Sequence, residues 1–169
     1  ALSSKEFPLV EKWATKLQGN IEQITIVENS VIIVRTITEI YALDIQSGAI
    51  LWQQSIAWHF SSQPVLAKNG MLLLTDGKGI LALNQSDGKM RWQQALRHPS
   101  SADIVDVTPD LVAVTDLPYL AVYQTLDGSL RWKKEVCGGI AQAYFFDTNI
   151  VVPCYGLTGM DALSGETVW

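Results

Sequence analysis

The side chains best suited to chemistry in this chain are two histidines, and they lack the company that a reactive site needs. His59 follows Trp52 by seven residues and His98 follows Trp92 by six, so the two occupy equivalent places. Two histidines without a third ligand make a poor metal site, because zinc sites gather three or four protein groups. We expect ordinary loop residues here, with no metal and no cofactor.

The two cysteines, Cys137 and Cys154, also match no reactive pattern. Their spacing fits no zinc motif. We expect two ordinary half-buried thiols, as free cysteines commonly are, and a disulfide is the alternative. The run Asp76-Gly77-Lys78-Gly79 predicts a hairpin turn and not a phosphate-binding loop. No catalytic residue is identified, so the sequence does not indicate an enzyme.

Composition narrows the classes of partner. Of the 169 residues, 48% are hydrophobic and 17% charged, which predicts a folded domain, and the net charge is −5 without a basic cluster. Nucleic acid is therefore not an expected partner, because its binding needs clustered Lys and Arg. No apolar run reaches the roughly 18 residues of a transmembrane helix. The chain starts without Met or a leader, which indicates a processed protein or a piece of a longer one.

A repeat of about 40 residues organises the chain. Five of the six tryptophans recur at spacings of 39, 40, 40 and 37 residues, and a glycine lies four residues before each of the last four. These residues are Trp13, Trp52, Trp92, Trp132 and Trp169, with Gly48, Gly88, Gly128 and Gly165. Self-similarity at such a period is typical of repeat architectures.

Each period reads as four short antiparallel strands. Ser-Gly or Asp-Gly between apolar runs predicts a hairpin turn, because glycine adopts a positive φ at little cost. Inner runs such as Val31–Val34 and Met71–Leu74 are apolar on both faces, as expected for sheets sandwiched between other sheets. The prediction is an all-β fold with four β-propeller blades, at about 20–56, 62–96, 102–136 and 140–169, after a tail at 1–10.

The recurring tryptophans have a structural role in this prediction. Each lies on the outermost strand of its blade and packs against the neighbouring blade, and the glycine keeps the turn tight enough for the ring to dock. A buried Trp removes about 200 Å² from water. The ladder is therefore expected to be core and not a ligand site.

The stretches 42–52 and 82–92, each running from Ala-Leu to the repeated Trp, resemble the repeat of pyrroloquinoline-quinone-type propellers, a tryptophan-docking family. The resemblance covers nearly the whole chain. The family includes quinone-dependent dehydrogenases and cofactor-free members such as the lipoprotein of the outer-membrane β-barrel assembly machinery. Members have seven or eight blades. The adjacent cysteines that the dehydrogenases carry are absent here.

Four blades imply an incomplete ring. Residues 11–17 predict a lone outer strand that has no blade of its own, because five outer strands accompany only four sets of inner strands. An open arc would leave apolar faces of its end blades in water. We expect about half of a larger propeller, closed either by missing blades or by a homodimer.

The leading functional hypothesis is a non-catalytic scaffold that binds a protein or peptide in envelope assembly, and that is periplasmic or otherwise extracytoplasmic. The candidate partner face is the set of blade-to-blade links with Trp58, His59, Phe60, Arg97 and His98, where out-of-register aromatics could be interface anchors. The alternative for Trp58 and Phe60 is that they cover the core edge. The rival functions are a fragment of a quinone-dependent dehydrogenase and the sensor domain of a membrane receptor.

Overall fold

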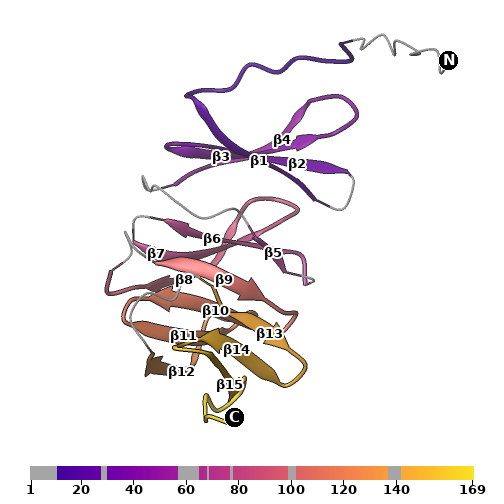
Figure 1. Ribbon diagram of the computed structural model, residues 1–169. Coiled ribbons are helices and arrows are strands. Elements are labelled where there is room, and N and C mark those ends of the chain that lie inside the picture. Colours follow the sequence, from indigo (N-terminus) through magenta and orange to yellow (C-terminus); the bar gives the residue numbers. More distant parts are fainter. Residues whose placement is uncertain are drawn as a thin grey trace, which may run out of the picture.

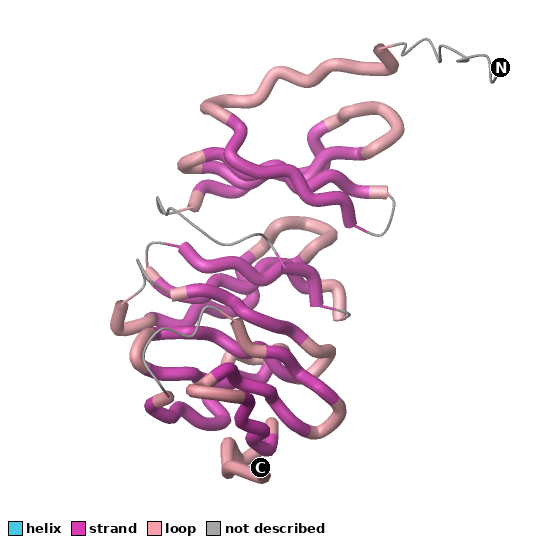
Figure 2. Tube along the Cα trace, in the orientation of Figure 1, coloured by secondary structure: helices cyan, strands magenta, loops and turns pink. Residues whose placement is uncertain are grey.

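The computed structural model describes residues 11–27, 30–56, 65–67, 69–76, 78–98, 102–136 and 142–169. Every regular element in these ranges is a β-strand, and the strands form four separate antiparallel sheets in chain order (Figure 2). The described residues contain no helix that could cross a membrane. The predicted all-β fold is confirmed.

Each sheet is a meander of consecutive strands. The first sheet holds β1 (Ile21–Val27), β2 (Val31–Thr36), β3 (Glu39–Asp44) and β4 (Ile50–Ser55), and the second holds β5 (Val65–Ala67), β6 (Met71–Asp76), β7 (Gly79–Asn84) and β8 (Met90–Ala95). The third holds β9 (Asp103–Val107), β10 (Leu111–Asp116), β11 (Tyr119–Gln124) and β12 (Leu130–Glu135), and the fourth holds β13 (Tyr144–Phe146), β14 (Asn149–Pro153) and β15 (Leu157–Asp161).

The sheets repeat one another in detail as well as in order. In the first three, the pairing of the third and fourth strands shifts register at the same place, after Ala42, Ala82 and Val122. The turn between those strands closes with a glycine N–H donating to the carbonyl four residues earlier, at 2.8 Å from Gly48 to Asp44. The Asp44 carboxylate accepts from the Ser47 N–H and hydroxyl, both at 2.7 Å. The repeated turn residues thus fix the hairpin.

The core lies between the sheets. Separate apolar clusters join the first sheet to the second, the second to the third and the third to the fourth. The run Met71–Leu74 on β6 is buried on both faces, because one face meets each neighbouring sheet. Figure 1 shows the sheets stacked face to face, with the first and fourth at opposite ends. The molecule is an open arc of propeller blades, an incomplete propeller.

The two ends of the arc differ from the expected strands. Residues 11–17, predicted as a lone outer strand, carry no strand assignment, since no sheet lies beside them for pairing. Residues 167–169 form only an isolated bridge between Thr167 and Met160. The fourth sheet therefore has three strands where its neighbours have four.

Cys154 corrects the expectation for the cysteines, because it is disulfide-bonded and not a free thiol. The only other cysteine in the sequence, Cys137, lies outside the described residues. Spacing along the chain could not decide between a thiol and a disulfide, because a bridge depends on how closely the two Cβ atoms approach in space.

Candidate functional site

The tryptophans of the first three blades join each blade to the next. Trp52, Trp92 and Trp132 are only 7–8% exposed. Their indole N–H groups donate to carbonyl oxygens of the following blade, at 2.8 Å to Gln85, 3.0 Å to Thr125 and 2.9 Å to Ala162. A buried indole N–H left unpaired would cost about 1–3 kcal/mol. These bonds therefore fix the orientation of each ring as well as its burial.

The repeated glycine packs directly against the tryptophan ring of the preceding repeat. A Cβ built on Gly88 would lie 2.5 Å from a Trp52 ring carbon, and one built on Gly128 would lie 2.5 Å from a Trp92 ring carbon. Both glycines also have φ near +70°. Sequence reasoning linked the glycine to ring docking only through the tightness of the turn, and it missed that a Cβ would collide with the ring. The contact between blades shows that the tryptophan ring leaves no room for any side chain at the glycine position.

Trp13 docks in the same manner although residues 11–17 belong to no sheet. Its indole N–H donates to the Ile45 carbonyl at 3.1 Å, and its ring covers Gly48. The Thr15 hydroxyl donates to the Gly48 carbonyl at 2.6 Å. Residues 11–17 thus lie against the first blade in the place that a preceding blade's outer strand would take.

Trp169 differs from the other repeated tryptophans. It is 57% exposed and its ring lies against Gly159 of its own blade. Tyr144, Phe146 and Leu157 of this blade are also exposed. The fourth blade therefore ends in an apolar face that no described residue of a following blade covers.

The first blade also presents apolar side chains at its free end. Ile24 and Ile26 of β1 are about 60% exposed. They pair with Val34 and Ile32 of β2, so these side chains share one face, on which Val34 is itself covered because it packs in a cluster with Leu17. We call this face and that of Tyr144, Phe146, Leu157 and Trp169 the two end faces. Apolar faces at both ends are the physical signature of a stack that lacks neighbours.

The blade-to-blade links were predicted to carry the partner face. Trp58, His59 and Phe60 lie outside the described residues. Arg97 and His98 follow β8, and both donate their backbone N–H groups to the Asp116 carboxylate, the His98 bond at 3.0 Å. The His98 imidazole Nδ1 lies 3.7 Å from the same carboxylate.

Asp116 is the charged residue that sequence reasoning missed. It is fully buried, and its carboxylate meets the Lys133 ammonium at 2.5 Å. Burial raises the pKa of Asp116, but the Lys133 ammonium and the His98 and Arg97 N–H groups outweigh burial and hold the pKa below its ordinary value. Lys133 also lies 4.7 Å above the Tyr119 ring. This cluster anchors the link between the second and third blades to the end of β10.

One signal could have found this cluster. Asp116 ends β10, two residues after its apolar run Leu111–Val114, and Lys133 directly follows Trp132. The pairing itself joins two strands that are not adjacent in the sheet, since β11 lies between β10 and β12. Within the described ranges, no three His, Cys, Asp or Glu side chains converge on a common point as metal ligands would.

Comparison with known proteins extends these observations. The family model described as outer membrane protein assembly factor BamB matches residues 10–113. Comparison with curated proteins gives no significant match. The chain resembles the crystal structure of BamB from Moraxella catarrhalis with a TM-score of 0.74 and 18% identity, covering 93% of this chain and 54% of that chain. It thus spans about half the length of that BamB chain.

Two other solved structures are similar. Sqt1 from Saccharomyces cerevisiae has a TM-score of 0.67 and 14% identity, over 82% of this chain and 43% of that chain. The computationally designed Ika4 protein has a TM-score of 0.62 and 17% identity, over 86% of this chain and 93% of that chain. Such identities show the propeller fold alone. The family match covers well over half of the chain, and the protein therefore belongs to the pyrroloquinoline-quinone-type propeller family of outer membrane protein assembly factor BamB.

Proposed function

We propose that this chain is a non-catalytic propeller scaffold that holds a protein partner during outer-membrane protein assembly. The observation that carries the proposal is the family match over residues 10–113. The structure supports it physically, because blades locked together by ring, glycine and carbonyl contacts form a rigid platform. A rigid platform lets loops bind a partner without a large ordering cost.

The disulfide at Cys154 supports an extracytoplasmic location. Structural disulfides persist in oxidising compartments such as the bacterial periplasm and are rare in the cytosol. The family description, an outer membrane assembly factor, fits the same compartment. We therefore propose that the scaffold lies in the periplasm.

The proposed partner surface is the face that carries the blade-to-blade links, which we call the link face. Its described part is Arg97 and His98, held by the buried Asp116 carboxylate. In a bacterium that encodes the chain, loss of the gene should lower the amount of folded β-barrel protein in the outer membrane, and the wild-type gene should restore it. The Arg97→Glu variant should restore it less well, because charge reversal disrupts a docking rim. Lys89→Glu, in the β7–β8 turn at the other end of β8, is the control. Unchanged barrel levels after gene loss would contradict the proposal.

The end faces support further blades that complete the ring. The Trp169 ring contacts Gly159 of its own blade and no glycine of a following blade. The Trp13 ring packs on Gly48 although residues 11–17 belong to no described sheet. In a closed ring, residues 11–17 would be the outer strand of the blade that precedes the first. A second copy could accept this segment at its three-stranded fourth sheet and return its own, which gives eight blades.

Light scattering of the purified 169-residue chain tests this completion by a second copy. The expected result is a dimer, with the Trp169 fluorescence shifted toward the blue as its ring becomes buried. The Phe146→Asp variant should dissociate it by placing a charge on an end face. A compact monomer with both end faces in water would contradict completion by a second copy.

A further inference from the structure

A cleft of about 420 Å³ opens between the first and second blades. It lies at the end of the strands opposite Arg97 and His98, because its described second-blade residues lie at or beside the β5–β6 and β7–β8 turns. Its volume falls within the roughly 300–1,000 Å³ of small-ligand pockets. The site is thus separate from the link face and from both end faces.

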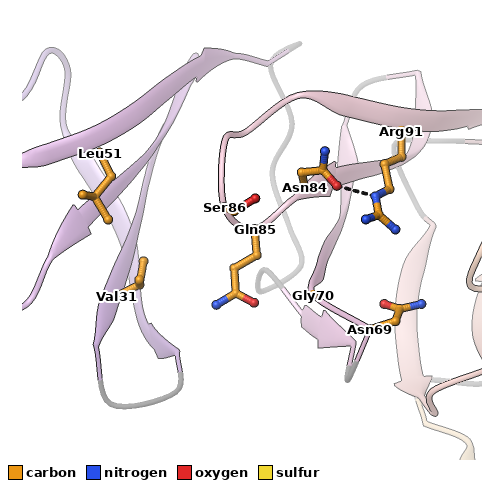
Figure 3. Close-up of a pocket in the computed structure, with 8 residues that line it drawn as sticks. All are labelled: Val31, Leu51, Asn69, Gly70, Asn84, Gln85, Ser86 and Arg91. Carbon is orange, nitrogen blue, oxygen red and sulfur yellow. Dashed lines mark hydrogen bonds between the residues drawn. The ribbon is translucent and has the colours of Figure 1, made fainter.

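The two walls of the cleft differ in chemistry. The first blade contributes Val31 and Leu51, and Leu51 is 53% exposed. The second blade contributes Asn84, Gln85 and Arg91. Figure 3 shows the Gln85 side chain between the apolar residues on one side and Arg91 on the other. A ligand that fits both walls must carry an aliphatic group beside a polar one.

Arg91 supplies the cation of the cleft. Its Nε–H donates to the Asn84 side-chain oxygen (Figure 3). No carboxylate among the described residues forms an ion pair with Arg91, whereas the nearby Asp87 is paired with Lys89 at 3.4 Å. The bond at Nε leaves the two terminal nitrogens of the guanidinium for another partner. Paired N–H groups of this kind bind a carboxylate in a bidentate manner.

The floor of the cleft favours a peptide backbone. Asn69 donates its side-chain N–H toward the Pro109 carbonyl at 3.5 Å, while its side-chain oxygen is buried without a hydrogen-bond partner in the described structure. A buried oxygen without a hydrogen-bond partner destabilises the protein. If the Asn69 amide turned toward the cleft, this oxygen could accept a hydrogen bond from a ligand N–H, and that bond would stabilise the complex. Gly70 beside it has open space where a side chain would project. Peptide N–H groups could therefore approach closely.

The blade architecture holds these groups in place before any ligand arrives. The Gln85 backbone N–H donates to the Gly70 carbonyl at 2.9 Å, and the Gln85 carbonyl accepts the Trp52 indole N–H at 2.8 Å. The docking tryptophan thus fixes the polar wall relative to the apolar one. Among the described lining residues, one guanidinium lies beside the neutral amides of Asn69, Asn84 and Gln85, which suits a monoanion, whereas a polyphosphate would need more positive charge.

We propose that this cleft binds a peptide carboxylate next to an aliphatic side chain, with Arg91 holding the carboxylate and Leu51 and Val31 contacting the aliphatic group. The carboxylate comes either from a chain terminus or from an acidic side chain, since both present the same two oxygens. The proposal deepens the scaffold function by naming a ligand class, and it rests on that function only for its biological context.

Isothermal titration at low salt tests the proposal with three blocked tetrapeptides that end in valine and leucine. The first has a free C-terminal carboxylate, the second has a C-terminal amide, and the third has the amide and a glutamate before the valine. The first peptide, the third, or both should bind at least tenfold more tightly than the second. Tight binding by the third alone would assign the carboxylate to a side chain, and tight binding by the first alone would assign it to the terminus.

Variants separate the proposed contact from general effects. Arg91→Ala should lower affinity for the carboxylate peptide at least tenfold, and Leu51→Asp should abolish binding by placing a like charge at the apolar wall. The matched control is Arg131→Ala, because Arg131 also precedes its blade's tryptophan and contacts Gln124 as Arg91 contacts Asn84. All three positions are exposed, so circular dichroism should show intact folding.

Three results would overturn the proposal: no binding by either carboxylate peptide, binding of the neutral amide as tight as that of both carboxylate peptides, or equal losses in Arg91→Ala and Arg131→Ala. None of these results would bear on ring completion or on barrel assembly, because the cleft shares no residue with the end faces or the link face.

Discussion

The docking of tryptophan on glycine gives the sharpest test of the fold, because the chain contains a matched control. Gly88 and Gly70 lie in the same blade at nearly the same backbone angle, with φ of +69° and +73°. A Cβ on Gly88 would collide with the Trp52 ring, whereas a Cβ on Gly70 would meet nothing within 4 Å. Replacing each by Ala therefore adds the same backbone strain, and only Gly88→Ala disturbs the ring.

The magnitudes follow from this difference. A left-handed conformation costs a non-glycine residue about 1–2 kcal/mol, which is the whole effect expected for Gly70→Ala. Gly88→Ala must also displace a ring that is 92% buried and break its hydrogen bond to Gln85. Losing a buried Trp entirely costs about 3–5 kcal/mol, which bounds this second contribution. We expect Gly88→Ala to destabilise by about 3 kcal/mol or more, and by at least twice as much as Gly70→Ala.

Urea unfolding followed by circular dichroism measures both variants, with the midpoint and slope compared to wild type. Gly128→Ala should behave like Gly88→Ala, because its Cβ would meet the Trp92 ring at the same distance. If Gly70→Ala and Gly88→Ala lose equal stability, then turn conformation alone explains the repeated glycine. The docking account of the blade interface would in that case be wrong.

Three further predictions concern the ends of the arc, the buried charge and the disulfide. Trp13→Ala should destabilise the first blade by about 2 kcal/mol, less than a fully buried Trp would, and hydrogen exchange should quicken in β3 more than in β11. Asp116→Ala should cost about 3 kcal/mol, because it strands a largely buried Lys133. The pKa of Asp116 is lower in the folded state than in the unfolded state. The contribution of Asp116 to the free energy of unfolding is therefore complete above the unfolded pKa and is lost as pH falls through the folded pKa. As the pH is lowered, the urea midpoint of Asp116→Asn should fall less steeply than that of the wild type. Cys154→Ser should lower stability by about 2–4 kcal/mol, and dithiothreitol should bring wild type to the same midpoint while leaving the variant unchanged.

The sequence predicted the propeller fold because each repeat is defined by local features, namely its turn residues and its apolar runs. Glycine turns such as that at Gly48 need no tertiary information, and runs such as Met71–Leu74 indicate burial on both faces by composition alone. The structure confirms the all-β propeller fold and its incompleteness. The strand expected at residues 11–17 is absent from the described sheets, because a strand requires a pairing partner and its side chains instead pack on the first blade.

The site was less predictable for the same physical reason. The partner face at Arg97 and His98 was proposed from repeat equivalence and stays a prediction, whereas the Asp116 and Lys133 pair beneath it joins residues across an intervening strand. The cleft beside Arg91 depends on how far the first two blades stand apart, which no local pattern encodes. Trp58, His59 and Phe60 lie outside the described residues, so their part of the prediction stays a prediction.

By itself, the sequence determined the period, the turns, the order of strands and the residues whose burial holds blade to blade. These properties follow from contacts within one repeat or between adjacent repeats, where chain connectivity fixes the geometry. Only the tertiary structure decided which glycine packs against which ring, and that Trp13 contacts a glycine of the first blade whereas Trp169 contacts only its own blade. It also decided that Cys154 forms a disulfide and that Arg91 lines an open cleft. Those outcomes depend on distances between separate sheets, which the covalent chain permits but does not specify.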